Sequence, residues 1–319
     1  MKKKINILVT GSSGFVGINL LSQLSTKKFK ITATYNKKKP IKFDNIIYKR
    51  INLLDKKKVD LITKNQDIIF HLAGKLGTKK ILQNHHLEIM RENMNSSINI
   101  ANSAYENNVK NFVWLSSSTG YPNRKKLNEE NYFEGDSLKD YEPIGLQCRF
   151  FEKLLKFYNR ISNQKMKIII LRPSIIFGKY DDFDPLTAHF LPSAISDIYN
   201  NKIVYLFNKG KIKRDWIYVS DLIDIMLNLV FKKDKKNYEV FNVGSGFKVS
   251  NDYIVKKIIK ILKKNKSLIK KKTVPKNKFN LSIRHFNLNK INKLNLPKSK
   301  NNFDQNLQET INWYTRNKK

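Results

Sequence analysis

An eight-residue segment near the amino end of the chain has the residue types and spacing to bind a phosphate-bearing ligand. Residues 10–17 read Thr-Gly-Ser-Ser-Gly-Phe-Val-Gly, between an apolar run at 5–9 and a stretch with apolar residues at helical spacing. Glycines let the backbone of such a turn approach a pyrophosphate, and the start of the following helix attracts its charge. A lone glycine turn is a weak signal, but a strand before it and a helix after it favour a dinucleotide site over a plain corner. The contacts expected from this turn are Gly11, Ser13, Gly14, Phe15, Val16 and Gly17.

The elements that position this turn alternate between strand-like and helical patterns. Strands are expected at 5–9, 30–35, 46–53, 67–72, 111–116 and 167–172, and helices at 86–107 and 144–162. Strands separated by helices imply right-handed crossovers and a parallel sheet. The sequence therefore predicts an α/β protein with a doubly wound parallel sheet, the Rossmann fold.

The pattern changes after about residue 174, where prolines and loops become frequent. We expect a dinucleotide-binding domain at 1–173 and a smaller, mainly substrate-binding portion at 174–319, with strand segments returning to the sheet. Helices are expected at 219–231 and 251–264. The dense charge of residues 263–278 predicts a mobile surface loop.

The composition limits the classes of partner. The formal net charge is +36, from 62 Lys plus Arg against 26 Asp plus Glu, but the lysine clusters are spread along the chain and lack interleaved aromatic residues. We therefore expect no dedicated nucleic-acid partner, although the charge would attract anionic nucleotides. The single cysteine, Cys148, fits a reducing compartment. No apolar run approaches the roughly 20 residues of a membrane span, no signal peptide is recognisable, and we expect a cytoplasmic protein.

Further motifs follow the glycine turn in order along the chain. They are Asn52-Leu53-Leu54-Asp55, His71-Leu72-Ala73-Gly74, Glu92-Asn93, the serine-rich run 115–122, the Leu-Arg-Pro run 171–178, the Arg-Asp run 214–221 and the Asn-Val-Gly run 241–246. Together with the turn they resemble the extended short-chain dehydrogenase/reductases, specifically the nucleotide-sugar epimerase/dehydratase family. The resemblance implies an enzyme with a nicotinamide cofactor that oxidises, reduces or epimerises a nucleotide-activated sugar for surface polysaccharide synthesis, as a homodimer.

The resemblance and the fold extend the expected cofactor contacts beyond the turn. The added residues are Asn36, Lys37, Asn52, Leu53, Leu72, Ala73, Gly74, Asn93, Ser116, Pro173 and Ile175. The end of the second strand has no acid for the ribose hydroxyls of NAD, and its basic residues suit the 2′-phosphate of NADP. The sequence leans toward NADP, and NAD stays open because lysine is abundant everywhere.

One part of the family pattern is missing. The family carries a Tyr and, four residues later, a Lys, which together handle the proton of the sugar hydroxyl. Aligning the segment Glu152-Lys153-Leu154-Leu155 with the family places Ile144 at the Tyr position and Cys148 at the Lys position. A rival register makes Tyr141 the family Tyr, with Gly145 in place of Lys. Neither register restores Tyr-x-x-x-Lys.

Other groups could supply the missing proton chemistry. The candidates are Ser117, Ser118, Tyr121 and Tyr141. Each tyrosine either transfers a proton or only lines the site, and Ser117 either orients a hydroxyl or caps a turn. Cys148 either titrates or packs as a small apolar side chain.

Substrate contacts are expected from basic residues of the second half. Arg214 resembles the family arginine that clamps the diphosphate, the alternative being an ion pair with Asp215. Arg284 and His189 are further candidates. No metal site is expected, because the pair His85-His86 lacks ligands at matching spacing.

The missing pair also motivates a second hypothesis, a non-catalytic NAD(P)-binding protein or partner subunit. The net charge motivates a third, an RNA-binding or membrane-surface-binding protein.

Overall fold

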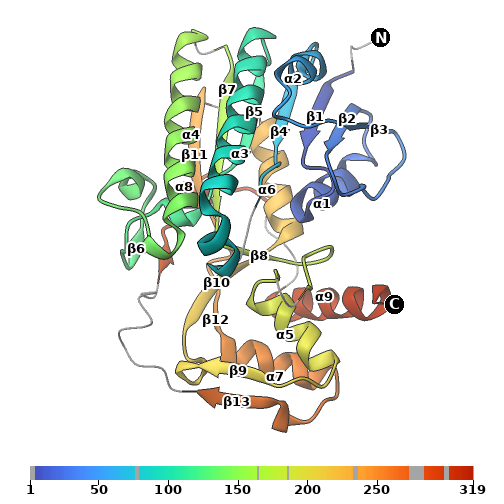
Figure 1. The fold of residues 1–319 in the computed structure, drawn as a ribbon, viewed down its shortest axis with the longest axis vertical. Helices are drawn as coiled ribbons and strands as arrows, with labels where there is room; N and C mark the ends of the chain where they lie inside the picture. The colour runs from blue at the N-terminus through green and yellow to red at the C-terminus, as the bar shows by residue number, and fades with distance from the viewer. Residues whose placement is uncertain are drawn as a thin grey trace.

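The computed structural model describes residues 4–75, 79–163, 165–184, 187–232, 236–272, 284–297 and 302–318, without the side chains of 79–84 and 140. These residues form two lobes stacked along the long axis of the molecule (Figure 1). The upper lobe holds the large sheet, and the lower lobe holds short strands and three helices.

The large sheet has seven strands in the order β11-β7-β5-β4-β1-β2-β3. They are β1 (Asn6–Thr10), β2 (Lys30–Tyr35), β3 (Ile46–Arg50), β4 (Ile68–His71), β5 (Asn111–Leu115), β7 (Lys167–Pro173) and β11 (Tyr238–Val243). All their pairings are parallel. The doubly wound parallel sheet expected from the sequence is confirmed, and β11, from the second half of the chain, completes its edge.

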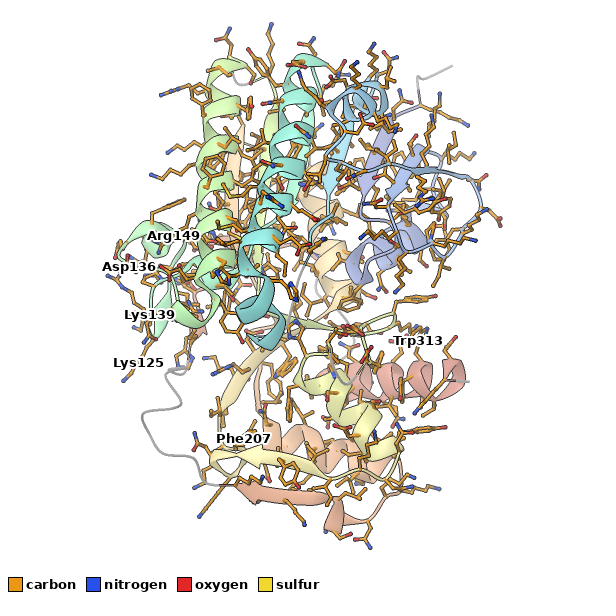
Figure 2. All side chains as sticks on the ribbon, viewed as in Figure 1. Lys125, Asp136, Lys139, Arg149, Phe207 and Trp313 are labelled. Atoms are coloured by element: carbon orange, nitrogen blue, oxygen red, sulfur yellow. The ribbon has the colours of Figure 1, made fainter. Side chains whose placement is uncertain are left out.

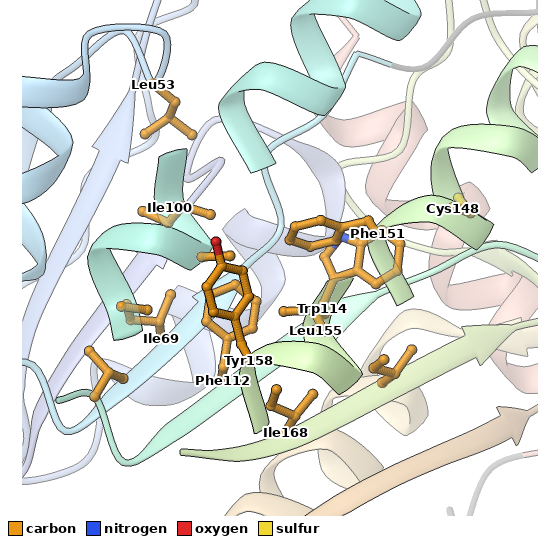
Figure 3. Packing of buried hydrophobic residues seen from close by; sticks show 14 of the residues in the cluster. Leu53, Ile69, Ile100, Phe112, Trp114, Cys148, Phe151, Leu155, Tyr158 and Ile168 are labelled. Atoms are coloured by element: carbon orange, nitrogen blue, oxygen red, sulfur yellow. The ribbon is translucent and has the colours of Figure 1, made fainter. Parts of the chain in front are cut away.

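Apolar residues on both sides of the strands bind a helical layer to each face. Helices α2 (Lys56–Thr63), α3 (Lys79–Glu106) and α4 (Glu142–Ile161) cover one face, and α1 (Phe15–Leu24) and α6 (Val219–Phe231) cover the other. Successive strand residues alternate between the two cores, as period-two geometry requires: Leu8 packs with the first, and Ile7 and Val9 pack with the second. Under α4, the ring of Phe151 meets Trp114 edge to face at 4.8 Å (Figure 3).

The lower lobe has its own core. It is built from β8 (Ile175–Phe177), β9 (Val204–Phe207), β10 (Lys213–Tyr218), β12 (Lys248–Ser250), β13 (Ile269–Lys272), α5 (Phe190–Tyr199), α7 (Asn251–Ile261) and α9 (Phe303–Asn317). Strands β12, β10 and β8 form one small sheet, and β13 and β9 form a separate parallel ribbon.

Several short elements complete the described part of the chain. Strand β6 (Lys126–Leu127) pairs with β14 (His285–Phe286), and α8 (Asn289–Asn292) follows. The 3-10 turns are η1 (Ser118–Gly120), η2 (Glu129–Phe133), η3 (Lys139–Tyr141), η4 (Asn208–Gly210) and η5 (Lys266–Leu268).

The prediction of a loop at 263–278 was wrong over the part that the structure describes. The segment holds η5 and β13, and β13 pairs with β9 through Ile269 beside Val204. Residues 273–278 lie outside the described residues. Lysine-rich sequence concealed the strand because three of its four side chains are exposed.

Candidate functional site

The turn after β1 allows a ligand to approach its backbone closely. Gly11 has a φ of 77°, and a Cβ there would lie 2.7 Å from the amide nitrogen of Ala73. A Cβ at Gly17 would overlap the carbonyl oxygen of Gly11. Both glycines are therefore required by the tight packing of this turn against α1 and the end of β4.

The amino end of α1 offers unsatisfied donors. Gly14 is its N-cap, and among the described residues no side chain caps the helix and no acid occupies its first turn. The hydroxyl of Ser12 is buried without a hydrogen-bond partner among the same residues. Free amides, a helix dipole and an unpartnered hydroxyl fit the pyrophosphate of a dinucleotide. The expected contacts Ser13, Phe15 and Val16 are all half-buried around this turn.

A buried polar chain fixes the neighbouring strand end. The Thr10 hydroxyl bonds with Nδ1 of His71 at 2.9 Å and accepts the amides of Leu72 and Ala73 at 3.2 Å. Nε2 of His71 bonds with the Ser97 hydroxyl at 3.0 Å. Burial lowers the pKa of His71 to about 3, so its ring is neutral. The sequence reasoning included Thr10 in the glycine-turn segment without giving it a role, and it did not consider Ser97.

The other expected cofactor residues frame the same edge. Asn93 accepts the amide of Lys75 at 2.7 Å and donates to its carbonyl at 2.9 Å, which fixes the backbone beyond Gly74. Asn52 accepts the Leu54 amide. The remaining positions are Leu53, which is buried, Ser116 after β5, Pro173 at the end of β7 and Ile175 at the start of β8.

The sequence reasoning missed a basic side chain, Arg50, that lies at the end of β2. Asn36 and Lys37 are exposed there. Arg50, the last residue of β3, donates from Nε to the carbonyl of Asn36 at 3.2 Å. The pairing of β2 with β3 brings this guanidinium to the place where the sequence showed only asparagine and lysine.

The hydroxyl groups of the serines after β5 form hydrogen bonds within the protein. Ser116 donates to Oε1 of Glu152 at 2.6 Å. Ser117 caps η1 by accepting the amide of Thr119 at 3.2 Å and its hydroxyl at 2.9 Å. Ser117 and Ser118 are both half-buried, so they remain within reach of a ligand.

Tyr121 lies in the interior of the protein. Its side chain is fully buried, and its hydroxyl donates to Oδ1 of Asn242 at 2.6 Å and accepts from Nη1 of Arg172 at 2.9 Å. Burial raises the pKa of Tyr121 to about 12, against the opposing charge of Arg172. These contacts indicate that Tyr121 supports the structure rather than transferring a proton.

The two residues at the family Tyr and Lys positions pack in the core. Ile144 and Cys148 are buried members of the first core cluster. Burial, with the charge of Glu152 adding to it, raises the pKa of the Cys148 thiol to about 12, so the thiol is neutral at physiological pH. Tyr141, the N-cap of α4, is half-buried. We call the junction of η3 and α4 at Tyr141 the rim of the site.

Two arginines from distant segments of the chain, Arg214 and Arg284, are coupled electrostatically. Arg284 donates from Nη2 to the carbonyls of Tyr121 and Pro122 at 3.4 Å, and its Nε is buried with no partner among the described residues. Burial and then the charge of Arg214 lower the pKa of Arg284 to about 10. Burial also lowers the pKa of Arg214, and Tyr141 partly offsets this effect. The three side chains therefore share one electrostatic environment.

The alternative partner of Arg214 is engaged elsewhere. The Asp215 carboxylate accepts from Ser174, Ser245 and Gly246, and so anchors the 244–246 turn. His189 is exposed at the N-cap of α5. Within the described ranges no group of three His, Cys, Asp or Glu residues could hold a metal, and no helix is long and apolar enough to cross a membrane.

The fold and this edge define a dinucleotide-binding α/β protein. The sequence matches the NAD dependent epimerase/dehydratase family over residues 7–244, and the chain belongs to that family. This match confirms the resemblance found in the motifs. The members of the family are NAD-dependent enzymes.

Relatives with known names support the same assignment. The chain is 28% identical to the GDP-L-colitose synthase of Yersinia pseudotuberculosis, over 82% of each chain, and 25% identical to the UDP-glucose 4-epimerase of Vibrio cholerae, over 79% of this chain and 74% of the other. A UDP-glucose 4-epimerase structure from Thermotoga maritima, with UDP-glucose, superimposes with a TM-score of 0.84 at 21% identity and covers 98% of this chain and 99% of its own.

Proposed function

We propose that this protein carries out NAD(P)-dependent oxidation, reduction or epimerisation of a nucleotide-activated sugar for surface polysaccharide synthesis, in the cytoplasm. Support comes from the glycine turn, from family membership and from relatives named for GDP- and UDP-sugars. Bound at the turn, a nicotinamide ring supplies the hydride acceptor or donor.

The observation that carries the substrate proposal is the pair Arg214 and Arg284. Two half-buried guanidiniums lie close enough to depress the pKa of Arg284, and no carboxylate among the described residues acts on either pKa. Two like charges in a partly desolvated site destabilise each other, so an anion that binds there is favoured. A diphosphate would neutralise both and could accept bidentate hydrogen bonds.

Tyr141 is the group that we propose for proton transfer. It lies at the rim beside Arg214, whereas Tyr121, Ile144 and Cys148 are buried. Because Tyr141 is half-buried, its phenol is accessible and could exchange a proton with a sugar hydroxyl. The half-buried Ser117 and Ser118 could orient that hydroxyl.

The test is turnover of a panel of GDP-, UDP- and dTDP-sugars with each coenzyme, followed by nicotinamide absorbance and by analysis of the sugar products. We expect Tyr141→Phe to lower kcat by about 10²- to 10⁴-fold, with coenzyme affinity unchanged. The matched removal of a buried hydroxyl, Tyr121→Phe, should lower stability and spare kcat. Equal kcat for Tyr141→Phe and wild type would contradict the role of Tyr141.

The second candidate function is a non-catalytic NAD(P)-binding protein or partner subunit. The burial of Ile144 and Cys148 at the family Tyr and Lys positions favours it, since neither can exchange a proton there. Tight coenzyme binding without turnover of any sugar in the panel would establish this alternative.

We propose NADP as the preferred coenzyme, with Arg50 as the residue that selects it. Its guanidinium lies over the end of β2 beside Asn36, where an arginine can accommodate the 2′-phosphate. Arg50→Gln should weaken NADP binding by about 10-fold or more, the scale of one charge-assisted contact, and leave NAD affinity unchanged. The control Lys49→Gln removes the same charge one residue earlier, and calorimetry compares the two. Tighter binding of NAD than of NADP to the wild type would refute the preference.

A homodimer through α4 completes the proposal. Leu146, Phe150, Phe157 and Ile161 are exposed and, at about 100° per residue, fall within an arc of about 60°. Such a stripe is about 23 Å long and can pair with its own copy across a two-fold axis. Leu146→Glu with Phe157→Glu should give a monomer in sedimentation velocity, and Leu61→Glu, at an exposed leucine of α2, should not. A monomeric wild type would refute this contact.

A further inference from the structure

The parallel ribbon of β9 and β13 turns one side of each strand outward from the lower lobe. Val204 and Leu206 are buried in the third core, whereas Ile203, Tyr205 and Phe207 are 38%, 42% and 47% exposed. The ribbon lies at the end of the molecule opposite the large sheet (Figure 1). In Figure 2, Phe207 lies on this lobe, well away from Arg149 and Lys139 beside α4.

Strand pairing places lysines among these apolar side chains. Lys270 is the partner of Tyr205, and Lys272 is the partner of Phe207. Both are exposed, as is Lys202 just before β9. Lys271, which is also exposed, is engaged elsewhere, since its ammonium contacts Asp252 at 3.1 Å. We call Ile203, Tyr205, Phe207, Lys270 and Lys272 the ribbon face; it contains no acidic residue.

We propose that the ribbon face docks on the surface of an anionic lipid bilayer. Aromatic and aliphatic side chains can enter the boundary between headgroups and acyl chains, while lysines contact the anionic headgroups. Each lysine near such a surface contributes about 1 kcal/mol. The inference stands apart from the reaction proposed above, because none of these residues belongs to the cofactor or sugar site.

Two other occupants fit the ribbon face less well. A second copy packed on it across a two-fold axis would place Lys270 and Lys272 of both copies in one interface, and this concentration of like charge costs free energy. Single-stranded RNA would stack bases on exposed rings, but the ammonium of Lys272 lies over the Tyr205 ring, 4.0 Å from its centroid. Ile203 has no ring on which a base could stack. Apolar insertion uses Ile203 and Phe207 directly, and Tyr205 once the Lys272 ammonium moves to an anionic headgroup.

The test measures partition of the full chain onto vesicles by co-sedimentation at about 0.15 M salt, where long-range attraction is screened. Vesicles are pure phosphatidylcholine or phosphatidylcholine with phosphatidylglycerol. Because the chain carries a formal charge of +36, charge alone must be controlled. Lys270→Glu with Lys272→Glu is therefore compared with Lys57→Glu on α2 combined with Lys64→Glu at its C-cap, which changes the charge equally at exposed sites of the other lobe. Tyr205→Ser with Phe207→Ser removes the rings without changing the charge.

We expect wild type to bind the anionic vesicles, with about a 10-fold weaker partition for the ribbon lysine variant and for the ring variant. The α2 variant should keep most of its binding. Equal losses in the two lysine variants, or full binding by the ring variant, would overturn the proposal. A ring variant that loses a single-stranded RNA oligonucleotide yet keeps the vesicles would identify a nucleic-acid surface instead.

A second variant measures insertion without a loss of binding. Phe207→Trp keeps an aromatic ring at the site and reports its polarity through fluorescence. Its emission should shift to shorter wavelength on anionic vesicles, relative to the wild-type chain with its own three tryptophans. Bound protein without such a shift would show that another face meets the membrane.

Discussion

Gly14→Asp is expected to weaken coenzyme binding strongly while leaving the protein about as stable as the wild type. Gly14 is the N-cap of α1 and has extended backbone angles, with φ −87° and ψ 161°, which aspartate adopts readily. Its carboxylate would cap the first turn, a gain over glycine of about a few tenths of a kcal/mol in the free energy of unfolding. A Cβ would lie 3.3 Å from the Gly11 carbonyl oxygen, so the backbone at Gly11 must shift by a few tenths of an ångström to admit it.

The same carboxylate would occupy the donors and the positive potential that a pyrophosphate requires. We expect the affinity for NADP and NAD to fall by about 100-fold or more, equivalent to about 2.7 kcal/mol, in isothermal calorimetry. The control Gly14→Asn also caps the helix but carries no charge, so it should lose less affinity. Aspartate-variant binding within about 3-fold of wild type would show that the phosphates lie elsewhere.

Arg172→Met should have the largest effect on stability. The arginine is 2% exposed and donates to both carboxylate oxygens of Glu152, at 2.9 Å and 2.6 Å. It also donates to the Tyr121 hydroxyl and lies 3.6 Å from the centroid of the Tyr132 ring. Its loss leaves Glu152, which is fully buried, without a counter-charge. Breaking a buried pair in this way costs about 3–5 kcal/mol, which urea unfolding would measure as a lower midpoint.

Two comparisons isolate the cause. Arg124 pairs with Glu134, but their side chains are 48% and 46% exposed, so Arg124→Met should cost no more than about 1 kcal/mol. Glu152→Leu combined with Arg172→Met removes both charges and should recover part of the stability. A loss no larger for Arg172→Met than for Arg124→Met would contradict the assignment of the pair as a structural support.

The network around Arg172 shows where sequence reasoning stopped. Tyr121 and Tyr141 were equal candidates in the sequence, because each lies near a family motif. The structure distinguishes them by depth: Tyr121 bonds with Asn242 and Arg172, from β11 and β7, whereas Tyr141 ends a 3-10 turn at the rim. How deeply each tyrosine is buried depends on strands that are far away along the chain, and the spacing of neighbouring residues does not encode those contacts.

The sequence alone determined the alternation of strands and helices, the glycine turn before α1 and the departure from Tyr-x-x-x-Lys. These features are local, since a few neighbouring residues set the backbone geometry and the side-chain types. The tertiary structure alone decided that the charge of Arg214 acts on the pKa of Arg284, that Arg50 covers the end of β2 and that Lys272 lies over the Tyr205 ring. Those contacts join segments between 14 and 70 positions apart, and only the packing of the sheets brings such segments together.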